Sequence, residues 1–191
     1  MVTGITGGMG SGKSTVSRLL RAMGYAVFDS DEEAKFLINS SLPLQKKLTE
    51  TFGESIFDNG TLNKAAFAAL IFSDSEQLKK ANSIIHPEVK RHFAEWLSMQ
   101  KKSPVFIESA ILFESNFDQL VDKVLLVYAP QHLRLERALM RGGEAQRHSI
   151  EQRMAQQIPD EEKIKLADFI VENDGNKAII PQVEQIVVEM Y

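Results

Sequence analysis

Short apolar runs alternate along this chain with longer segments in which apolar residues recur every three or four positions. The runs have the length of buried strands, and the longer segments have the period of amphipathic helices. We expect strands at residues 1–6, 26–28, 105–107, 123–128 and 169–171. Short, continuously apolar strands between helices are typical of a parallel sheet covered on both faces. The pattern therefore predicts an α/β fold with a five-stranded parallel sheet.

Helices are expected between and after these strands. The helical period predicts them at residues 13–23, 131–141, 149–157, in a short segment from Pro159, and at the end of the chain. A further helix should begin at Ser30, because Glu33 three residues later completes a capping-box pattern. The double glycine Gly142-Gly143 is a candidate hinge between two of these helices.

Residues 42–102 have a helical pattern throughout. Asp58-Asn59-Gly60 marks a turn within it, and Pro43 and Pro87 mark helix starts or interruptions. The stretch joins the second and third strands but is too long for a single crossover helix. We interpret it as a helical substrate-binding insertion.

A glycine-rich loop follows the first strand and opens the first helix. Gly7, Gly12, Lys13 and Ser14 match the pattern G-x-x-x-x-G-K-[ST] in the strand–helix context that this motif requires. Glycines let backbone N–H groups surround a phosphate, and the helix N-terminus adds its positive dipole end. The lysine supplies charge for the β- and γ-phosphates, and the serine hydroxyl can ligate Mg²⁺. The loop therefore predicts a P-loop phosphotransferase that binds MgATP.

The residues expected to bind the nucleotide lie in and directly after this loop. They are Gly8, Gly10, Ser11, Gly12, Lys13, Ser14 and Thr15, with Ser14 as the candidate metal ligand. ATP is favoured over GTP by elimination. The guanine-specific pattern N-K-x-D is incomplete at Asn63-Lys64 and at Asn176-Lys177, because neither pair is followed by the aspartate.

Acidic side chains stand at the ends of two predicted strands. Asp29 and Asp31 follow the second strand, and Glu108 ends the third. Ligand sites of open parallel sheets lie at these carboxyl ends. We expect Asp31 to accept the proton of a substrate hydroxyl, with Glu108 or Asp29 helping to hold the metal through water. The alternative interpretation of Asp31 is favourable electrostatics at a helix N-terminus.

Arginines share one face of the helix expected at residues 131–141. Arg134, Arg137 and Arg141 are spaced i, i+3 and i+7. Beside a P-loop, such a segment can neutralise the transferring phosphate and exclude water, so we predict a lid with Arg137 and Arg141 as catalytic residues. The alternative is a solvated helix face. His86, before Pro87, is either a substrate contact or a residue at a helix start.

Composition narrows the class of protein. The chain has 191 residues, of which 43% are hydrophobic and 25% charged, with a net charge of −4. That length suits one domain with small insertions, and the acidic balance disfavours nucleic-acid binding. There is no cysteine, which excludes disulfides and thiolate zinc sites and fits a cytoplasmic location. We expect no membrane association, because no apolar run approaches about 18 residues. We expect no signal peptide, because glycines and Lys13 occupy the place where its apolar stretch would lie.

Taken in order, the motifs resemble those of the dephospho-coenzyme A kinase family over essentially the whole chain. The segments that carry the resemblance are Gly4–Ser14; Asp29-Ser30-Asp31, similar to D-A-D; Leu62-Asn63 with Ile71-Phe72; Ile85-His86-Pro87; Ala110–Glu114, similar to P-L-L-F-E; Arg137 with Arg141; Arg153 with Gln156; and Ala167–Gly175, similar to A-D-x-V-I-x-N-x-G. Two positions depart from the family pattern. Ala110 stands in place of proline, and Gly142-Gly143 replaces the aspartate after the lid arginine, which affects the lid geometry.

The resemblance implies transfer of the ATP γ-phosphate to the ribose 3′-hydroxyl of dephospho-coenzyme A. It implies that Asp31 is the general base, that Arg137 and Arg141 bind phosphate oxygens, and that Asn173 lies near the adenine. It also implies three parts: a nucleotide core (1–30, 103–136 and 166–191), a coenzyme A-binding part (31–102) and a lid (137–165). We expect a monomer or weak homo-oligomer.

Three other functional classes share part of this pattern. A kinase of the nucleoside-monophosphate type shares the core and lid and would differ in the helical insertion. A nucleotide-dependent switch is disfavoured by the missing GTPase motifs and by the candidate catalytic aspartate. An ATP-driven nucleic-acid enzyme is disfavoured by the acidic composition and the short chain.

Overall fold

The computed structural model describes residues 1–72 and 74–190. The chain folds as two compact units. One contains residues 1–29 and 100–190, and the other is Ser30–Met99. The first unit is a sheet with helices, and the second is mainly helical.

The first unit is organised by a parallel sheet. Within the described residues, five strands pair in the order β2-β5-β1-β6-β7. Their bounds are Val2–Thr6 for β1, Val27–Asp29 for β2, Val105–Glu108 for β5, Lys123–Tyr128 for β6 and Phe169–Glu172 for β7. Every pairing between neighbours is parallel. The predicted α/β fold and its five parallel strands are confirmed.

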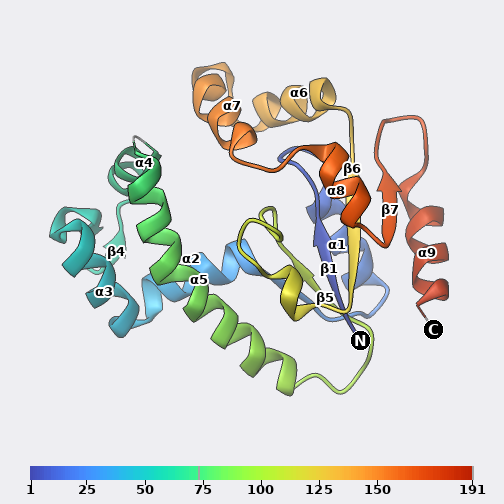
Figure 1. Cartoon of the computed structure of the whole chain (residues 1–191), viewed down its shortest axis with the longest axis horizontal. Helices are drawn as coiled ribbons and strands as arrows, with labels where there is room; N and C mark the ends of the chain where they lie inside the picture. The colour runs from blue at the N-terminus through green and yellow to red at the C-terminus, as the bar shows by residue number, and fades with distance from the viewer. Residues whose placement is uncertain (73, 191) are drawn as a thin grey trace. The chain divides into compact units, whose positions relative to one another are not determined.

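Two helices cover one face of this sheet. They are α1 (Lys13–Ala22) and α9 (Ile179–Glu189). Their apolar stripes pack on the central strands in a core of Ile5, Val16, Leu20, Phe106, Leu125, Val127, Val171, Val183, Ile186 and Val187. Figure 1 shows α1 behind the sheet and α8 (Asp160–Leu166) in front of β6. The sheet is therefore covered on both faces, as its continuously apolar strands predict.

The segment between β6 and β7 is helical. After β6 the chain forms α6 (Gln131–Gly142), the short helix η3 (Glu144–Gln146), α7 (Arg147–Ala155) and then α8. Gly143 ends α6 with φ 79°, a left-handed backbone that glycine adopts without strain. A second short helix, η2 (Asp118–Leu120), precedes β6.

The helical unit is built around one long helix, α5 (Ser75–Ser98), which contacts the other three. Those three are α2 (Ser30–Ser40), α3 (Leu42–Phe52) and α4 (Lys64–Phe72). On α5, a stripe at four-residue spacing is buried, consisting of Ala81, Ile85, Val89 and Phe93. A short helix η1 (Glu54–Ile56) and the strands β3 (Phe57–Asp58) and β4 (Thr61–Leu62) complete the unit.

Two expectations for this unit are wrong. Residues 42–102 are not helical throughout, because the turn at Asp58-Asn59-Gly60 joins the antiparallel pair β3 and β4. Strands of two residues are too short to leave an alternating pattern. Pro87 neither starts nor interrupts a helix, since it lies inside α5. Pro43 does stand at a helix start, in the first turn of α3.

Candidate active site

The P-loop lies where β1 ends and α1 begins. Gly12 stands at the N-terminal end of α1 with φ 102°. The first N–H groups of a helix have no partner within the helix, and the first turn of α1 carries no acidic residue. This end of α1 is therefore suited to an anion. Ser11 and Lys13 are buried within the loop, and Thr15 is exposed on the first turn.

Lys13 lies folded onto its own loop. Its ammonium donates to the carbonyl oxygens of Gly7 at 3.0 Å and Gly8 at 3.3 Å. Only 9% of the residue is exposed. The cation therefore stands against the backbone that would surround a phosphate.

Asn173, directly after β7, contacts the P-loop. Its side-chain amide donates to the Ser11 carbonyl at 2.7 Å, and its backbone N–H donates to the Tyr128 carbonyl at 2.7 Å. A Cβ on Gly12 would lie 2.2 Å from the Asn173 Nδ2 atom and would displace this amide, and the φ of 102° at Gly12 itself favours glycine. Asn173 thus contacts the P-loop, while its expected place near the adenine stays a prediction.

Ser14, Glu108 and Asp29 form the polar edge of the sheet beside the loop. The Ser14 hydroxyl donates to Glu108 Oε1 at 3.0 Å, and Asp29 is the register partner of Glu108 in the β2–β5 pair. Glu108 is buried, and its second oxygen, Oε2, has no hydrogen-bond partner among the described residues. A hydroxyl and carboxylate oxygens are ligands that suit Mg²⁺.

No group of three His, Cys, Asp or Glu side chains arranged to hold a metal occurs in residues 1–72 and 74–190. A P-loop magnesium does not need such a group, since one hydroxyl, a single carboxylate and the phosphates of the nucleotide could hold it. The Ser14–Glu108 pair, with its unpartnered carboxylate oxygen, therefore fits the ion.

The three arginines of α6 have different environments. Arg134 is buried, with its Nε donating to the Ala129 carbonyl at 3.1 Å and its guanidinium paired with Asp160. Arg137 donates to the Asn173 carbonyl at 3.0 Å. Arg141 is exposed and donates to the Arg137 carbonyl at 3.3 Å. Of the three arginines predicted to share a helix face, Arg134 is therefore buried and makes structural contacts within the unit.

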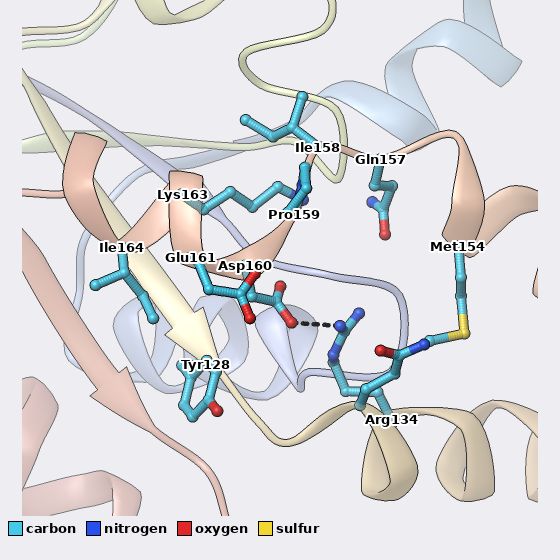
Figure 2. A pocket seen from close by; sticks show the side chains of 11 residues that line it. Tyr128, Arg134, Met154, Gln157, Ile158, Pro159, Asp160, Glu161, Lys163 and Ile164 are labelled. Atoms are coloured by element: carbon cyan, nitrogen blue, oxygen red, sulfur yellow. Dashed lines mark hydrogen bonds and ion pairs between the residues drawn. The ribbon is translucent and has the colours of Figure 1, made fainter.

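A cavity of about 410 Å³ lies between α6, the end of β6 and residues 154–164. Figure 2 shows the Arg134–Asp160 ion pair on its wall, with Gln157 and Lys163 contributed by the segment from α7 into α8. The sequence does not identify these four residues as partners, because Arg134 and Asp160 are 26 positions apart. The sequence predicts helices on both sides of Pro159 and the family resemblance of Arg153 with Gln156, but not these contacts.

Lys163 is a lysine with no exposed surface. Its ammonium lies 3.8 Å from Glu114 Oε1, and no hydrogen bond to Nζ is present in the described part of the chain. Burial lowers the pKa of this ammonium, and the nearby Glu114 carboxylate opposes that effect. The same Glu114 oxygen accepts the Ile158 backbone N–H at 2.9 Å, which anchors the connection between α7 and α8.

Two predicted site residues belong to the helical unit. Asp31 lies in the first turn of α2 with an exposed side chain, beside Glu32 and Glu33. His86 lies in the interior of α5 and is half-buried. Burial lowers the pKa of His86, and the positive charge of Lys90 lowers it further. Because His86 lies well inside α5, its interpretation as a residue at a helix start is wrong.

None of the helices in residues 1–72 and 74–190 combines the length and apolar character of a membrane span.

The matching family model and the similar curated proteins point to one family. The family model described as "Dephospho-CoA kinase" matches residues 1–178. A dephospho-CoA kinase from Bacteroides fragilis is 44% identical over 189 residues, covering 98% of this chain and 92% of that protein. The crystal structure of TT1252 from Thermus thermophilus has a TM-score of 0.86 at 37% identity and covers 99% of this chain and 96% of its own.

A more distant structure supports the fold. Dephospho-CoA kinase from Campylobacter jejuni has a TM-score of 0.70 at 24% identity, covering 98% of this chain and 96% of that one. The fold is therefore shared with a solved structure of low sequence identity.

Proposed function

Because the chain belongs to the dephospho-coenzyme A kinase family, which phosphorylates dephospho-coenzyme A with ATP in the last step of coenzyme A synthesis, we propose that it phosphorylates the ribose 3′-hydroxyl. The observation that carries this function is the P-loop at the start of α1, in which Lys13 lies against the loop carbonyls. In the reaction, a bond forms between the 3′-oxygen and the γ-phosphorus. The bond from that phosphorus to the β–γ bridging oxygen breaks and releases ADP.

Lys13 and the loop amides serve the phosphates of ATP. The ammonium neutralises charge on the β- and γ-phosphates, and the N–H groups at the start of α1 bind phosphate oxygens. The loop residues involved are Gly8, Gly10, Ser11, Gly12, Lys13, Ser14 and Thr15. Asn173 adds a contact from the end of β7 to the same loop, which supports a place for it at the nucleotide.

Asp31 accepts the proton of the 3′-hydroxyl as that oxygen attacks. Two arguments support this role. First, Asp31 lies only two residues after Asp29, the last residue of β2, and two residues of chain span at most about 7 Å. Substrate sites of parallel sheets lie at such strand ends. Second, a carboxylate is the group that kinases use to accept a hydroxyl proton.

Mg²⁺ is held by Ser14, with Glu108 and Asp29 as the neighbouring carboxylates. The Ser14–Glu108 hydrogen bond and the unpartnered oxygen of Glu108 support this assignment. When bound, the ion neutralises charge on the phosphates. The residues of this chain then have three tasks, which are to orient the phosphates, to hold the hydroxyl, and to receive its proton.

Arg137 and Arg141 act from the lid on the transferring phosphate, and His86 and Glu108 contact the substrate side. Arginine suits this task because its planar guanidinium binds phosphate oxygens in pairs and stays charged.

The three-part division assigns residues 1–30, 103–136 and 166–191 to nucleotide binding, 31–102 to coenzyme A binding, and 137–165 to the lid. We further propose a cytoplasmic enzyme that is a monomer or weak homo-oligomer, which analytical ultracentrifugation can test.

The direct test is incubation of the purified protein with MgATP and dephospho-coenzyme A, with mass spectrometry of the products. Adenosine monophosphate and other nucleoside monophosphates run as competing acceptors. Coenzyme A and ADP in equal amounts, formed far more slowly by Lys13→Ala, are the expected result. Phosphorylation of a nucleoside monophosphate instead would favour the related kinase type. Formation of ADP without any phosphorylated acceptor would overturn the acceptor assignment and favour a nucleotide-dependent switch.

A further inference from the structure

We propose that Gln157 is a positioning residue for Lys13, and that it acts through the orientation of the peptide group between Gly8 and Met9. This inference rests on the phosphate role proposed for Lys13. Gln157 lies just after α7, on the wall of the cavity drawn in Figure 2, and is 148 positions from Met9 in the sequence.

The Gly8–Met9 peptide is held on both of its polar sides. Its N–H, from Met9, donates to Gln157 Oε1 at 2.8 Å. Its carbonyl, from Gly8, accepts the Lys13 ammonium at 3.3 Å and the Ser11 N–H at 3.0 Å. In a planar trans peptide the N–H and the carbonyl point in opposite directions. Gln157 and Lys13 therefore bind opposite edges of one rigid group.

This arrangement makes the position of Lys13 depend on Gln157. If the peptide rotated, its carbonyl would leave the ammonium and its N–H would turn towards the positive charge. Gly8 resists such a rotation weakly, because glycine has the widest range of backbone conformations. The Gln157 carbonyl oxygen supplies the restraint that the glycine-rich backbone lacks.

The Gln157 amide is itself fixed in one orientation. Its Nε2 donates to the Ala110 carbonyl at 2.6 Å, so Oε1 is the atom that faces the Met9 N–H. The next residue, Ile158, is anchored by its N–H to Glu114 at 2.9 Å. Both supports come from the segment between β5 and β6. Gln157 thus connects that segment to the P-loop, with each of its two polar atoms paired.

The test is a double-mutant cycle between Gln157 and Lys13, measured as kcat and KM for ATP in coenzyme A formation. Gln157→Leu removes both hydrogen bonds at similar size. We expect it to lower kcat/KM by about 10- to 100-fold, since displacement of a catalytic group by about 1 Å can cost that much. In the Lys13→Ala background the same substitution should cost less than about twofold, because the group that Gln157 positions is gone.

The controls separate this role from stability. Gln152→Leu, an exposed glutamine on α7, should leave kcat and KM unchanged. Gln157→Glu keeps the side-chain size and an oxygen that can accept the Met9 N–H. Its second oxygen would face the Ala110 carbonyl oxygen, where Nε2 now donates, so we expect this variant to lose activity. If Gln157→Leu does not fold, Gln157→Asn, which shortens the side chain, replaces it in the cycle.

Two results would overturn the inference. One is an equal loss from the Gln157 substitution in the wild-type background and in the Lys13→Ala background, measured on folded protein. The other is an unchanged kcat/KM for Gln157→Leu. Full activity of Lys13→Ala alone would instead refute the role proposed for Lys13, so failure of the two proposals can be told apart.

Discussion

At the scale of single residues, the proposed proton acceptor can be tested against its own neighbour. Asp31→Asn keeps the shape of the side chain but removes its basicity. We expect kcat to fall by about 10²- to 10⁴-fold, with little change in KM for ATP, because general-base catalysis contributes about that much. The measurement is steady-state coenzyme A formation at saturating substrates.

Glu32 provides the matched control for Asp31. It is the next residue of α2, exposed and paired with Lys35 at 2.7 Å. Glu32→Gln likewise replaces a carboxylate with an amide. It should leave kcat within about twofold of the wild-type value, because exposed ion pairs such as Glu32–Lys35 contribute little free energy. If Asp31→Asn turns over as fast as Glu32→Gln, the carboxylate serves only the electrostatics of the helix N-terminus.

Gly8 tests how tightly the P-loop packs against α6. A Cβ at this position would lie 1.8 Å from Arg134 Nη1, and Arg134 is tethered to Asp160 and Ala129. The guanidinium therefore cannot move aside without breaking those contacts. We expect Gly8→Ala to destabilise the fold by about 1–3 kcal/mol and to lower turnover by about 100-fold. Thermal unfolding and turnover per folded molecule measure the two effects.

A second glycine separates the steric effect from a general loss of stability. Gly24 has φ 90° and no atom within 4 Å of an added Cβ. Gly24→Ala should therefore cost about 1–2 kcal/mol of backbone strain but leave turnover of the folded enzyme intact. Wild-type turnover in Gly8→Ala would mean that the loop and Arg134 separate easily.

At the scale of elements, His86 on α5 should make the free energy of unfolding depend on pH. Burial, and then the charge of Lys90, lowers the pKa of His86 below the 6.5 expected of a free histidine. Between the lowered pKa and 6.5, the unfolded chain binds more protons than the folded one. Stability therefore rises with pH through that window and is lost as the pH falls below 6.5, by at most about 1.4 kcal/mol per pH unit.

The variant His86→Gln isolates this contribution. Its free energy of unfolding should fall less than that of the wild type between pH 7.5 and pH 5.5, as measured by urea denaturation. An NMR titration of the ring proton, assigned by its absence in His86→Gln, measures the pKa directly. A His86 that titrates at or above 6.5 in the folded protein would contradict the prediction.

Elements also show how far the sequence alone could lead. The strands were predictable because each is a continuous apolar run, and the P-loop because its motif is local and lies between a strand and a helix. The β3–β4 pair was missed because two-residue strands leave no period. Pro87 was misread because proline is usually excluded from a helix interior, whereas the buried stripe of α5 continues on both sides of it. Partners such as Met9 and Gln157 were missed because no local pattern links residues 148 positions apart.

At the scale of the whole molecule, the division into two units predicts where a nucleotide acts. All the contacts that support the phosphate site come from the unit of residues 1–29 and 100–190. Saturating that unit with MgATP at 100 times its dissociation constant should stabilise it by about 2.7 kcal/mol. For a chain of this length, that corresponds to an increase of about 5–10 °C in the unfolding midpoint.

Hydrogen exchange can locate this stabilisation within the chain. We expect MgATP to slow exchange of the amides of β1, the P-loop and α1 more than those of Ser30–Met99, since local stability follows the contacts that a ligand adds. Lys13→Ala should lose most of the protection, because the charge for the β- and γ-phosphates is gone. Protection confined to Ser30–Met99 would place nucleotide binding in the helical unit and refute the assignment of the P-loop as the ATP site.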